Sequence, residues 1–407
     1  MESRHRPPLK AQAGIEYSAL SCRRHSAVLT EFGAVDDGKT SNTEAFRDAI
    51  STLSPMAADG GVQLIVPPGK WLTGSFNLTS HFTLFIQKGA TLLASQNEIT
   101  QYGRGYFSMT NLNTEYPVVA PLPSYGRGRD APGPRFASLI SGTNLTDVII
   151  TVYCENVIIK GVTILAPIDS PNTDGIDPDS CTNTLIEDCY VVSGDDCIAV
   201  KSGWDQYGIK TAMPTQQLSI RRLTCISPDS AGVALGSEMS GGIKDVRIED
   251  ITLIQTQSAI RIKTAVGRGG YVKDIFARRV TMKTMKYVFW MSGAYNQHAD
   301  GKWDAKALPV VKNINYRDMT AENVTIAAWL EGIKNDPFTG ICMSNVSILL
   351  SPKPKKLQWN CTDIAGVTSK VTPEPCSLLP EKAKPVDCAF PEDKIPIESV
   401  VMKKCVA

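Results

Sequence analysis

The stretch Asp245-Val246-Arg247-Ile248-Glu249-Asp250-Ile251-Thr252 is one copy of a pattern that recurs along the chain. The pattern is an Asn or Asp followed by alternating β-branched residues, often ending in Thr. Other clear copies begin at Asp147, Asn156, Asp274 and Asn313, and looser copies centre on Leu185, Leu218 and Ile341. Alternation with a period of two residues is typical of β-strands. The pattern therefore predicts a chain built of repeated short strands.

The spacing of the copies indicates how these strands are arranged. Counted from Val157, the first apolar residues of successive copies are 28, 33, 28, 29, 39 and 27 residues apart. Periods of 20 to 50 residues built of short strands indicate a solenoid. A propeller would need about four strands in each repeat of roughly 40 residues. We therefore predict an all-β fold, a parallel β-helix with two or three strands per repeat.

One spacing breaks the series. Val148 and Val157 are only nine residues apart, which is too few to close a coil. Either both copies lie on one coil, or residues are missing between Ile150 and Thr151.

The rest of the chain divides into three parts. Residues 1–29 show no periodicity and are predicted to be an irregular tail, and residues 30–350 are predicted to form the β-helix. A short capping helix is expected near its start, because Ala45, Phe46, Ala49 and Ile50 share one helical face. Residues 351–407 contain Cys361, Cys376, Cys388 and Cys405 and are expected to form a C-terminal cap pinned by disulfides.

Composition excludes several classes of function. The chain has 407 residues, of which 43% are hydrophobic and 20% charged, and a net charge of +1. A nucleic-acid-binding protein would be expected to show a strongly basic face. No apolar run reaches the roughly 20 residues of a membrane span, and the first thirty residues show no secretory signal. Eleven cysteines and five Asn-x-Ser/Thr sequons nevertheless suit an oxidising, glycosylating route.

Candidate catalytic groups lie in the stretch from Asn172 to Cys197, which contains seven carboxylates. Asp195 and Asp196 are adjacent and lie between apolar residues that predict strands. Asp is rare in strands and a buried charge is costly, so this pair calls for an explanation. Asp174 precedes Asp196 by 22 residues, close to one coil, so the two should stack on neighbouring rungs about 4.8 Å apart. Paired acids that act on a glycosidic bond are one explanation.

Two later coils add further groups to this predicted ladder. Residues 230–237 are rich in Gly and Ser, and the next coil carries Arg261 and Lys263. These two cations are two residues apart in a predicted strand, so they project from the same face. They could bind a carboxylate of a substrate, or they could form a solvated surface pair.

The motifs Asn172-Thr173-Asp174, Gly194-Asp195-Asp196-Cys197 and Arg261-Ile262-Lys263, in this order, resemble those of the polygalacturonases of glycoside hydrolase family 28, plant members above all. The resemblance covers about residues 30–365. It implies a right-handed parallel β-helix and hydrolysis of α-1,4-galacturonosyl bonds in pectin with inversion at the anomeric carbon.

The resemblance also implies roles for single residues. Asp195 would be the general acid, and Asp174 and Asp196 would activate the water. Arg261 and Lys263 would bind the galacturonate carboxylate. The residues expected to contact substrate also include Asn172, from the first motif, and Tyr295, which is either a sugar platform or a packed loop aromatic. Cys197 and Cys225 are 28 residues apart, about one coil, and could form a disulfide, as they do in the family at this place.

Two departures from the family pattern bear on activity. Ala231 stands where many polygalacturonases have the histidine of a Gly-His-Gly motif. The coils that usually precede the Asn-Thr-Asp motif are also absent, which agrees with the short spacing at Ile150/Thr151. Alternatives are therefore a rhamnogalacturonan hydrolase or a catalytically weak or inactive wall-polysaccharide-binding homologue. A pectate lyase fits paired acids less well, because it would need Ca²⁺ ligands and a basic residue.

The expected partner is a polysaccharide, pectin or homogalacturonan, with no nucleic acid and no membrane span. No cofactor and no metal are expected. The resemblance implies an extracellular, cell-wall location, and we expect a monomer.

Overall fold

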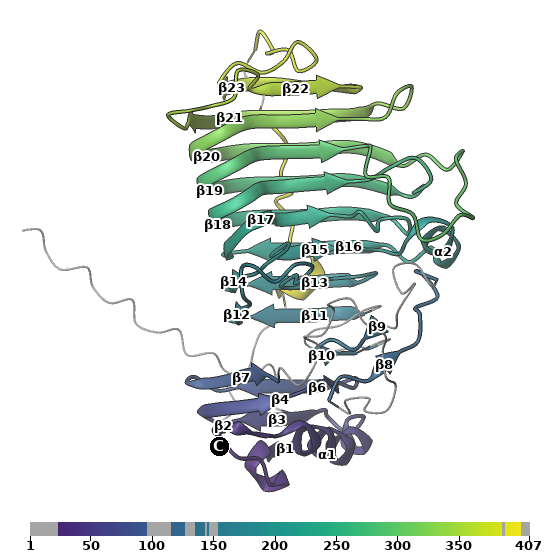
Figure 1. The fold of residues 1–407 in the computed structure, drawn as a ribbon, viewed down its shortest axis with the longest axis vertical. Coiled ribbons are helices and arrows are strands. Elements are labelled where there is room, and N and C mark those ends of the chain that lie inside the picture. The colour runs from purple at the N-terminus through teal and green to yellow at the C-terminus, as the bar shows by residue number, and fades with distance from the viewer. Residues whose placement is uncertain are drawn as a thin grey trace, which may run out of the picture.

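The computed structural model describes residues 23–95, 115–126, 135–142, 145, 154–384 and 387–399. Its strands stack as the coils of a right-handed parallel β-helix, as predicted (Figure 1). Within the described residues, all the ladders are parallel except that between β8 (Val118–Val119) and β9 (Arg135–Phe136). Among the described helices, none is long and apolar enough to cross a membrane.

The first coils form two small parallel sheets covered at one end by a helix. The first sheet has the order β1-β3-β6 and the second β2-β4-β7. The elements are β1 (His25–Val28), β2 (Asp37–Ser41), α1 (Thr43–Leu53), β3 (Val62–Val66), β4 (Gly69–Thr73), β6 (Phe82–Ile86) and β7 (Ala90–Ala94), with 3-10 turns at Leu29–Phe32 and Ser54–Met56. Helix α1 buries the four apolar residues that predicted it. The irregular tail expected over residues 1–29 ends earlier than predicted, because β1 pairs with β3.

The main stack carries the candidate site and follows the chain to residue 372. Its long strands bend at the corners of the coil and so run through more than one face. The elements are β11 (Glu155–Lys160), β12 (Thr163–Leu165), β13 (Thr182–Glu187), β14 (Tyr190–Val192), β15 (Ile198–Val200), α2 (Asp205–Thr211), β16 (Thr215–Arg221), β17 (Thr224–Leu235), β18 (Ile243–Lys263), β19 (Tyr271–Ser292), β20 (Val310–Glu331), β21 (Phe338–Leu350), β22 (Trp359–Thr362) and β23 (Ile364–Thr372).

The Asn or Asp that opens each repeat has a local reason. Asn156, Asp245, Asp274 and Asn313 all have positive φ, between 50° and 59°. Asn and Asp tolerate this left-handed conformation better than other non-Gly residues. The amide of Asn313 also donates to the carboxylate of Asp274 on the rung below, at 2.7 Å. The repeated polar residue therefore marks the corner of each coil.

The register confirms most of the repeat and corrects one copy. Leu218, Val246 and Ile275 are direct partners on successive rungs, as their spacing predicted. Thr184, however, is the partner of both Val157 and Leu218, so Leu185 is displaced by one residue. A shift of one residue in a strand moves a side chain to the opposite face. Leu185 accordingly packs outside the main core, with Ile395 and Ile397, while Ile186 is fully buried in the core.

Two features were not expected from the sequence. Helix α2 has only seven residues, including Gly208, and therefore shows no helical period. The C-terminal segment does not only cap the last coil, because residues 387–399 run back along the stack (Figure 1). This strap is fixed by a disulfide between Cys342 and Cys388 and ends in a 3-10 turn, Pro396–Ser399, where the Glu398 carboxylate accepts from Arg221 at 2.6 Å.

The described residues leave a gap in sequence just before β11, because residues 146–153 lie outside them. Among the described strands, β11 pairs only with β13, and no ladder connects it to β6 or β7. The small ladder of β5 (Phe76–Asn77) with β10 (Ile140–Ser141) is also separate. Leu145 packs against both the N-terminal and the main core. The junction residues Ile150 and Thr151, and Val148 beside them, lie outside the described residues.

Candidate active site

Three carboxylates from neighbouring rungs form a cluster. Asp174 lies in the loop between β12 and β13, and Asp195 and Asp196 lie between β14 and β15. Backbone bonds join the two loops, with the Gly175 N–H donating to the Asp196 carbonyl at 2.9 Å. One carboxylate oxygen from each of the three acids lies within 4.8 Å of the others. The structure thus brings together the three acids that the sequence singled out.

Asp196 is the buried member of the cluster, only 1% exposed. One carboxylate oxygen accepts from the Ser230 hydroxyl at 2.5 Å and the Ala231 N–H at 3.0 Å, and the other from the Lys263 ammonium at 2.7 Å. Burial alone would raise the pKa of Asp196, but the Lys263 charge and these donors outweigh it and hold the pKa below its usual value. Asp196 is therefore ionised at neutral pH.

Asp195 is more accessible than Asp196, and its backbone is firmly held. Its carbonyl accepts from the hydroxyls of Ser193 and Ser227, both at 2.6 Å. Its side chain accepts from the Asp196 N–H at 2.9 Å. The half-buried carboxylate consequently has a fixed position at the surface of the ladder.

A lysine that the sequence analysis did not consider joins Asp174 to one further acid, Asp177. The Lys201 ammonium lies 2.9 Å from Asp174 and 2.8 Å from Asp177. Its pKa is raised well above its usual value, because the neighbouring carboxylates outweigh the effect of burial. Through Lys201, Asp177 belongs to the acid cluster, although the sequence analysis did not single it out.

The carboxyl of Asp177 has a strongly raised pKa. Loss of hydration within the acid cluster raises the pKa of Asp177 to about 7, although its side chain is still 40% exposed; the Lys201 charge opposes this rise and repulsion by Asp174 adds to it. A carboxyl with a pKa raised above that of the unfolded chain favours the folded state most at low pH. That contribution is lost as the pH rises from about 4 to about 7.

We expect the Asp177→Asn variant to lack this pH dependence, because an amide does not titrate. The difference in melting temperature, variant minus wild type, should increase between pH 4 and pH 7 and become constant above about pH 8. Thermal unfolding followed by circular dichroism over this range measures it. Melting curves that shift in parallel with pH would show that Asp177 does not titrate in the folded protein.

Arg261 and Lys263 project from one face at the end of β18, beside the acids. The Arg261 guanidinium lies 3.7 Å from the centre of the Trp290 ring, and its buried Nε has no hydrogen-bond partner among the described residues. The ring of Tyr295 lies 5.8 Å from Arg261 and 5.7 Å from Lys263. Tyr295 is therefore close to both cations.

The other positions named from the sequence differ in how closely they approach the acid cluster. Asn172 is exposed and has a φ of 55°, which suits a turn leading into the acid loop. Ala231 is fully buried, and its contribution to the cluster is its N–H on Asp196. The disulfide considered from the spacing is present, because Cys197 and Cys225 are bridged with a Cα–Cα distance of 6.2 Å. It ties the rung of the acids to the rung of Ser230.

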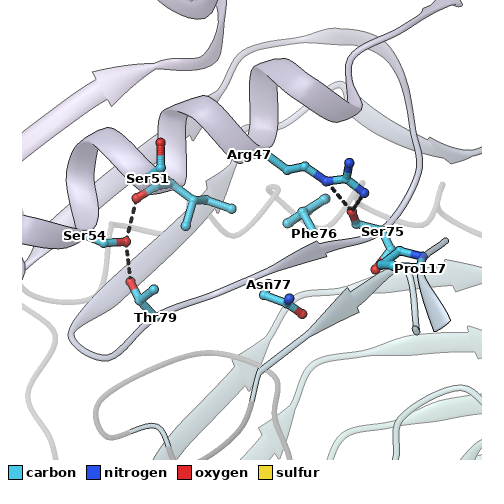
Figure 2. A pocket seen from close by; sticks show the side chains of 9 residues that line it. Arg47, Ser51, Ser54, Ser75, Phe76, Asn77, Thr79 and Pro117 are labelled. Atoms are coloured by element: carbon cyan, nitrogen blue, oxygen red, sulfur yellow. Dashed lines mark hydrogen bonds between the residues drawn. The ribbon is translucent and has the colours of Figure 1, made fainter. Parts of the chain in front are cut away.

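The acid cluster lies apart from a pocket in the N-terminal part of the structure. A cavity of about 320 Å³ lies against α1, lined by Arg47, Phe76 and Pro117 among others (Figure 2). Its one charged lining residue, Arg47, donates to the Ser75 carbonyl at 3.0 Å. Nothing in this lining resembles an acid–base pair, so the open surface over β15, β17 and β18 is the better candidate for a long polymer.

Comparison with known proteins identifies the family. A model of the glycosyl hydrolases family 28 matches residues 138–372. A probable polygalacturonase from Vitis vinifera is 56% identical over an alignment of 448 residues, covering 96% of this chain and 88% of that protein. The chain belongs to glycosyl hydrolases family 28.

More distant relatives agree with this family assignment. An exopolygalacturonase from Zea mays is 24% identical and covers 84% of this chain and 87% of its own length. Among solved structures, an exopolygalacturonase from Thermotoga maritima has a TM-score of 0.65 at 22% identity and covers 89% of this chain and 93% of its own length. A family 28 exopolygalacturonase from Yersinia enterocolitica has a TM-score of 0.64 at 18% identity, with 92% and 78% covered. At these identities the structures support the fold.

In this family 28 chain, Lys201 could have been found from the sequence. The segment Ile198-Ala199-Val200-Lys201 has the same alternation as Ile260-Arg261-Ile262-Lys263. Val200 and Leu235 are partners, and so are Leu235 and Ile262, which places the two segments two rungs apart in one column. The lysine that ends each segment therefore reaches the same face as the acids.

The cluster of three acids raises the question of a metal ion. Oxygen ligands suit a hard cation such as Ca²⁺. Two ammonium groups, however, already neutralise two of the three carboxylates, Lys201 at Asp174 and Lys263 at Asp196. The donor set therefore fits proton transfer better than metal binding.

Proposed function

We propose that this glycoside hydrolase cleaves α-1,4-galacturonosyl bonds of polygalacturonan in pectin. The observation that carries the proposal is the position of Arg261 and Lys263 beside the acid cluster, with Lys263 in contact with Asp196. Acids provide proton transfer to and from the glycosidic oxygen and water. Cations in contact with them favour a sugar that bears a carboxylate.

The roles follow from the environments of the acids. Asp196 is ionised and buried, so it suits activation of water, together with Asp174. Asp195 is the more accessible acid, and its backbone is fixed by two serine hydroxyls. We therefore assign Asp195 as the general acid that protonates the leaving oxygen.

Inversion at the anomeric carbon is proposed from the family resemblance. Inverting enzymes usually separate their two carboxyl groups by about 6.5 to 9.5 Å to make room for the water. The nearest oxygens of the three acids here lie within 4.8 Å. If hydrolysis inverts the configuration at the anomeric carbon, the water must therefore be held beside the acid cluster and not between two opposed carboxyls.

Release of reducing ends from purified polygalacturonate and from rhamnogalacturonan tests the substrate. We expect release from polygalacturonate above that from rhamnogalacturonan, because two cations face the cleavage site. Equal release from both, or release from rhamnogalacturonan alone, would contradict the proposal. The configuration of the first product, followed by NMR, tests inversion separately.

Lys263→Ala is expected to have two effects. Loss of the ammonium should raise the KM for polygalacturonate by about tenfold or more, and much less for a neutral glycan. It should also raise the pKa of Asp196, which Lys263 helps to hold down. Because Asp196 must be ionised to activate water, the acidic limb of the pH–rate profile should move to higher pH. Lys263→Arg, which keeps the charge, is the control, and equal KM changes on both glycans would indicate a structural lysine.

The missing coils remain part of the proposal. The Vitis alignment spans 448 residues, whereas 96% of the 407 residues here is about 391, so about 57 residues of that relative have no counterpart in this chain. Two repeats of this chain are about as long. We infer that the gap lies at Ile150/Thr151, ahead of β11.

We also propose an extracellular, cell-wall location and a monomeric state. Three described disulfides, Cys197–Cys225, Cys342–Cys388 and Cys361–Cys376, suit an oxidising compartment. The relatives from Vitis vinifera and Zea mays are both plant proteins, a probable polygalacturonase and an exopolygalacturonase, and the polymer proposed as substrate here is a wall polysaccharide.

A further inference from the structure

A column of outward-facing side chains continues from the cations toward the C-terminal coils. Arg261, Trp290 and Trp329 are direct partners on β18, β19 and β20. Their inward neighbours, such as Phe289 and Leu330, are fully buried in the core. Side chains alternate between the two faces of a strand, so the three residues share the outer face. They form one continuous surface column, which we call the aromatic column.

The rings of this column are held by packing. Trp290 lies under the Arg261 guanidinium at 3.7 Å and beside Tyr287, with ring centres 4.7 Å apart. Tyr287 is itself buried and meets the edge of the Trp329 ring at 6.5 Å. Trp329 nevertheless remains 36% exposed. A large aromatic side chain fixed in place and still exposed is typical of a binding surface.

The charge changes sign along a parallel column next to this one. Lys263, Ser292 and Glu331 are partners on the same three rungs. Lys263 carries the positive charge beside the acids, Ser292 is neutral, and Glu331 is negative. Glu331 accepts from the Trp329 indole N–H at 3.4 Å and forms no salt bridge within the part of the chain that the structure describes. Its charge is therefore not compensated by a neighbouring cation.

The spacing of the rungs matches a polysaccharide lying along the column. Successive rungs are about 4.8 Å apart, so Trp329 lies about 10 Å beyond Arg261. A pyranose unit is about as long as one rung spacing. A sugar stacked on Trp329 would present any free carboxylate to the Glu331 carboxylate, and two like charges at this distance repel. A methyl ester or a neutral sugar would meet no such repulsion.

We propose that the aromatic column is a sugar-binding track, and that Glu331 makes its far end selective for a methyl-esterified or neutral sugar over free galacturonate. This inference rests on the proposed function only for the identity of the polymer. The rung of Arg261 and Lys263 takes a free carboxylate, and the rung of Trp329 and Glu331, two coils away, disfavours one. The preferred ligand is then a galacturonan that carries esters in part and free carboxylates in part.

Binding tests this selectivity without any hydrolysis. The probes are an unesterified galacturonate hexamer and its partly methyl-esterified counterpart, titrated calorimetrically against the full chain carrying Asp195→Asn. We expect the esterified hexamer to bind more tightly. Adding Glu331→Gln should reduce that preference about three- to fivefold, mainly by tighter binding of the unesterified hexamer, since a partly exposed charge is worth about that much. Glu322→Gln, an exposed acid elsewhere on β20, is the matched control.

A second variant tests the track itself. Trp329→Ala should weaken the binding of both hexamers. Titration with either hexamer should also quench less indole fluorescence than it does in the chain that keeps Trp329. The proposal is overturned if Glu331→Gln changes the two affinities equally, or if Trp329→Ala changes neither. Because the assay measures affinity, failure of the chain to hydrolyse pectin would contradict the proposed function and would leave this result standing.

Discussion

Asp195→Asn should lower the rate of polygalacturonate hydrolysis by about 100-fold or more while the melting temperature stays close to that of the wild type. The amide keeps the shape of the carboxyl group and its bond from the Asp196 N–H, but it has no proton to give to the leaving oxygen. General acid catalysis is typically worth 10²- to 10⁴-fold. Initial rates of reducing-end release at saturating substrate measure this loss.

The matched control is Asp229→Asn, which removes an exposed carboxylate from the neighbouring strand β17. It should change the rate less than about twofold, because Asp229 lies outside the acid cluster. If Asp195→Asn retained more than about a tenth of the activity, Asp195 would not be the general acid.

The second large effect concerns the coils proposed to be missing at Ile150/Thr151. In a solenoid each coil rests on its neighbours, so a loss of coils there would leave strand groups and apolar side chains without the rung that covers them in the complete stack. Insertion of the corresponding segment of the Vitis relative, about 57 residues, between Ile150 and Thr151 should restore two rungs. We expect the melting temperature to rise by about 5 °C or more and polygalacturonate hydrolysis to increase by about tenfold or more.

A Gly/Ser segment of equal length at the same position is the control, because it adds residues without adding rungs. It should leave both quantities unchanged or lower them. If the chain as it stands is fully active and the Vitis segment changes neither quantity, then no coils are missing.

The sequence predicted the fold well because a solenoid repeats its local chemistry. Asn156, Asp274 and Asn313 signal the corner of a coil through their tolerance of positive φ, and the alternating apolar residues signal the strands. The prediction failed where a shift of one residue in the register of a strand moves a side chain to the other face. Leu185 was aligned by its apolar character, but its strand is shifted by one residue and its side chain packs under the C-terminal strap.

The candidate site was predictable in part for the same reason. Acids and cations that stand in motifs one coil apart could be placed on neighbouring rungs. Lys201 could have been found from its alternation with Ile198 and Val200, but its pairing with Asp177 could not, because that pairing depends on where the loop of Asp177 meets the end of β15. The change of sign from Lys263 to Glu331 could not be predicted either, because it depends on the register of three long strands.

The most direct test of the account is hydrolysis of polygalacturonate by the chain carrying the Vitis segment, with and without Asp195→Asn, on the same day and at the same protein concentration. We predict saturated reducing ends, released at least about 100-fold faster when Asp195 is present. Equal rates from the two proteins, or an unsaturated product formed by elimination, would contradict hydrolysis by the acid cluster.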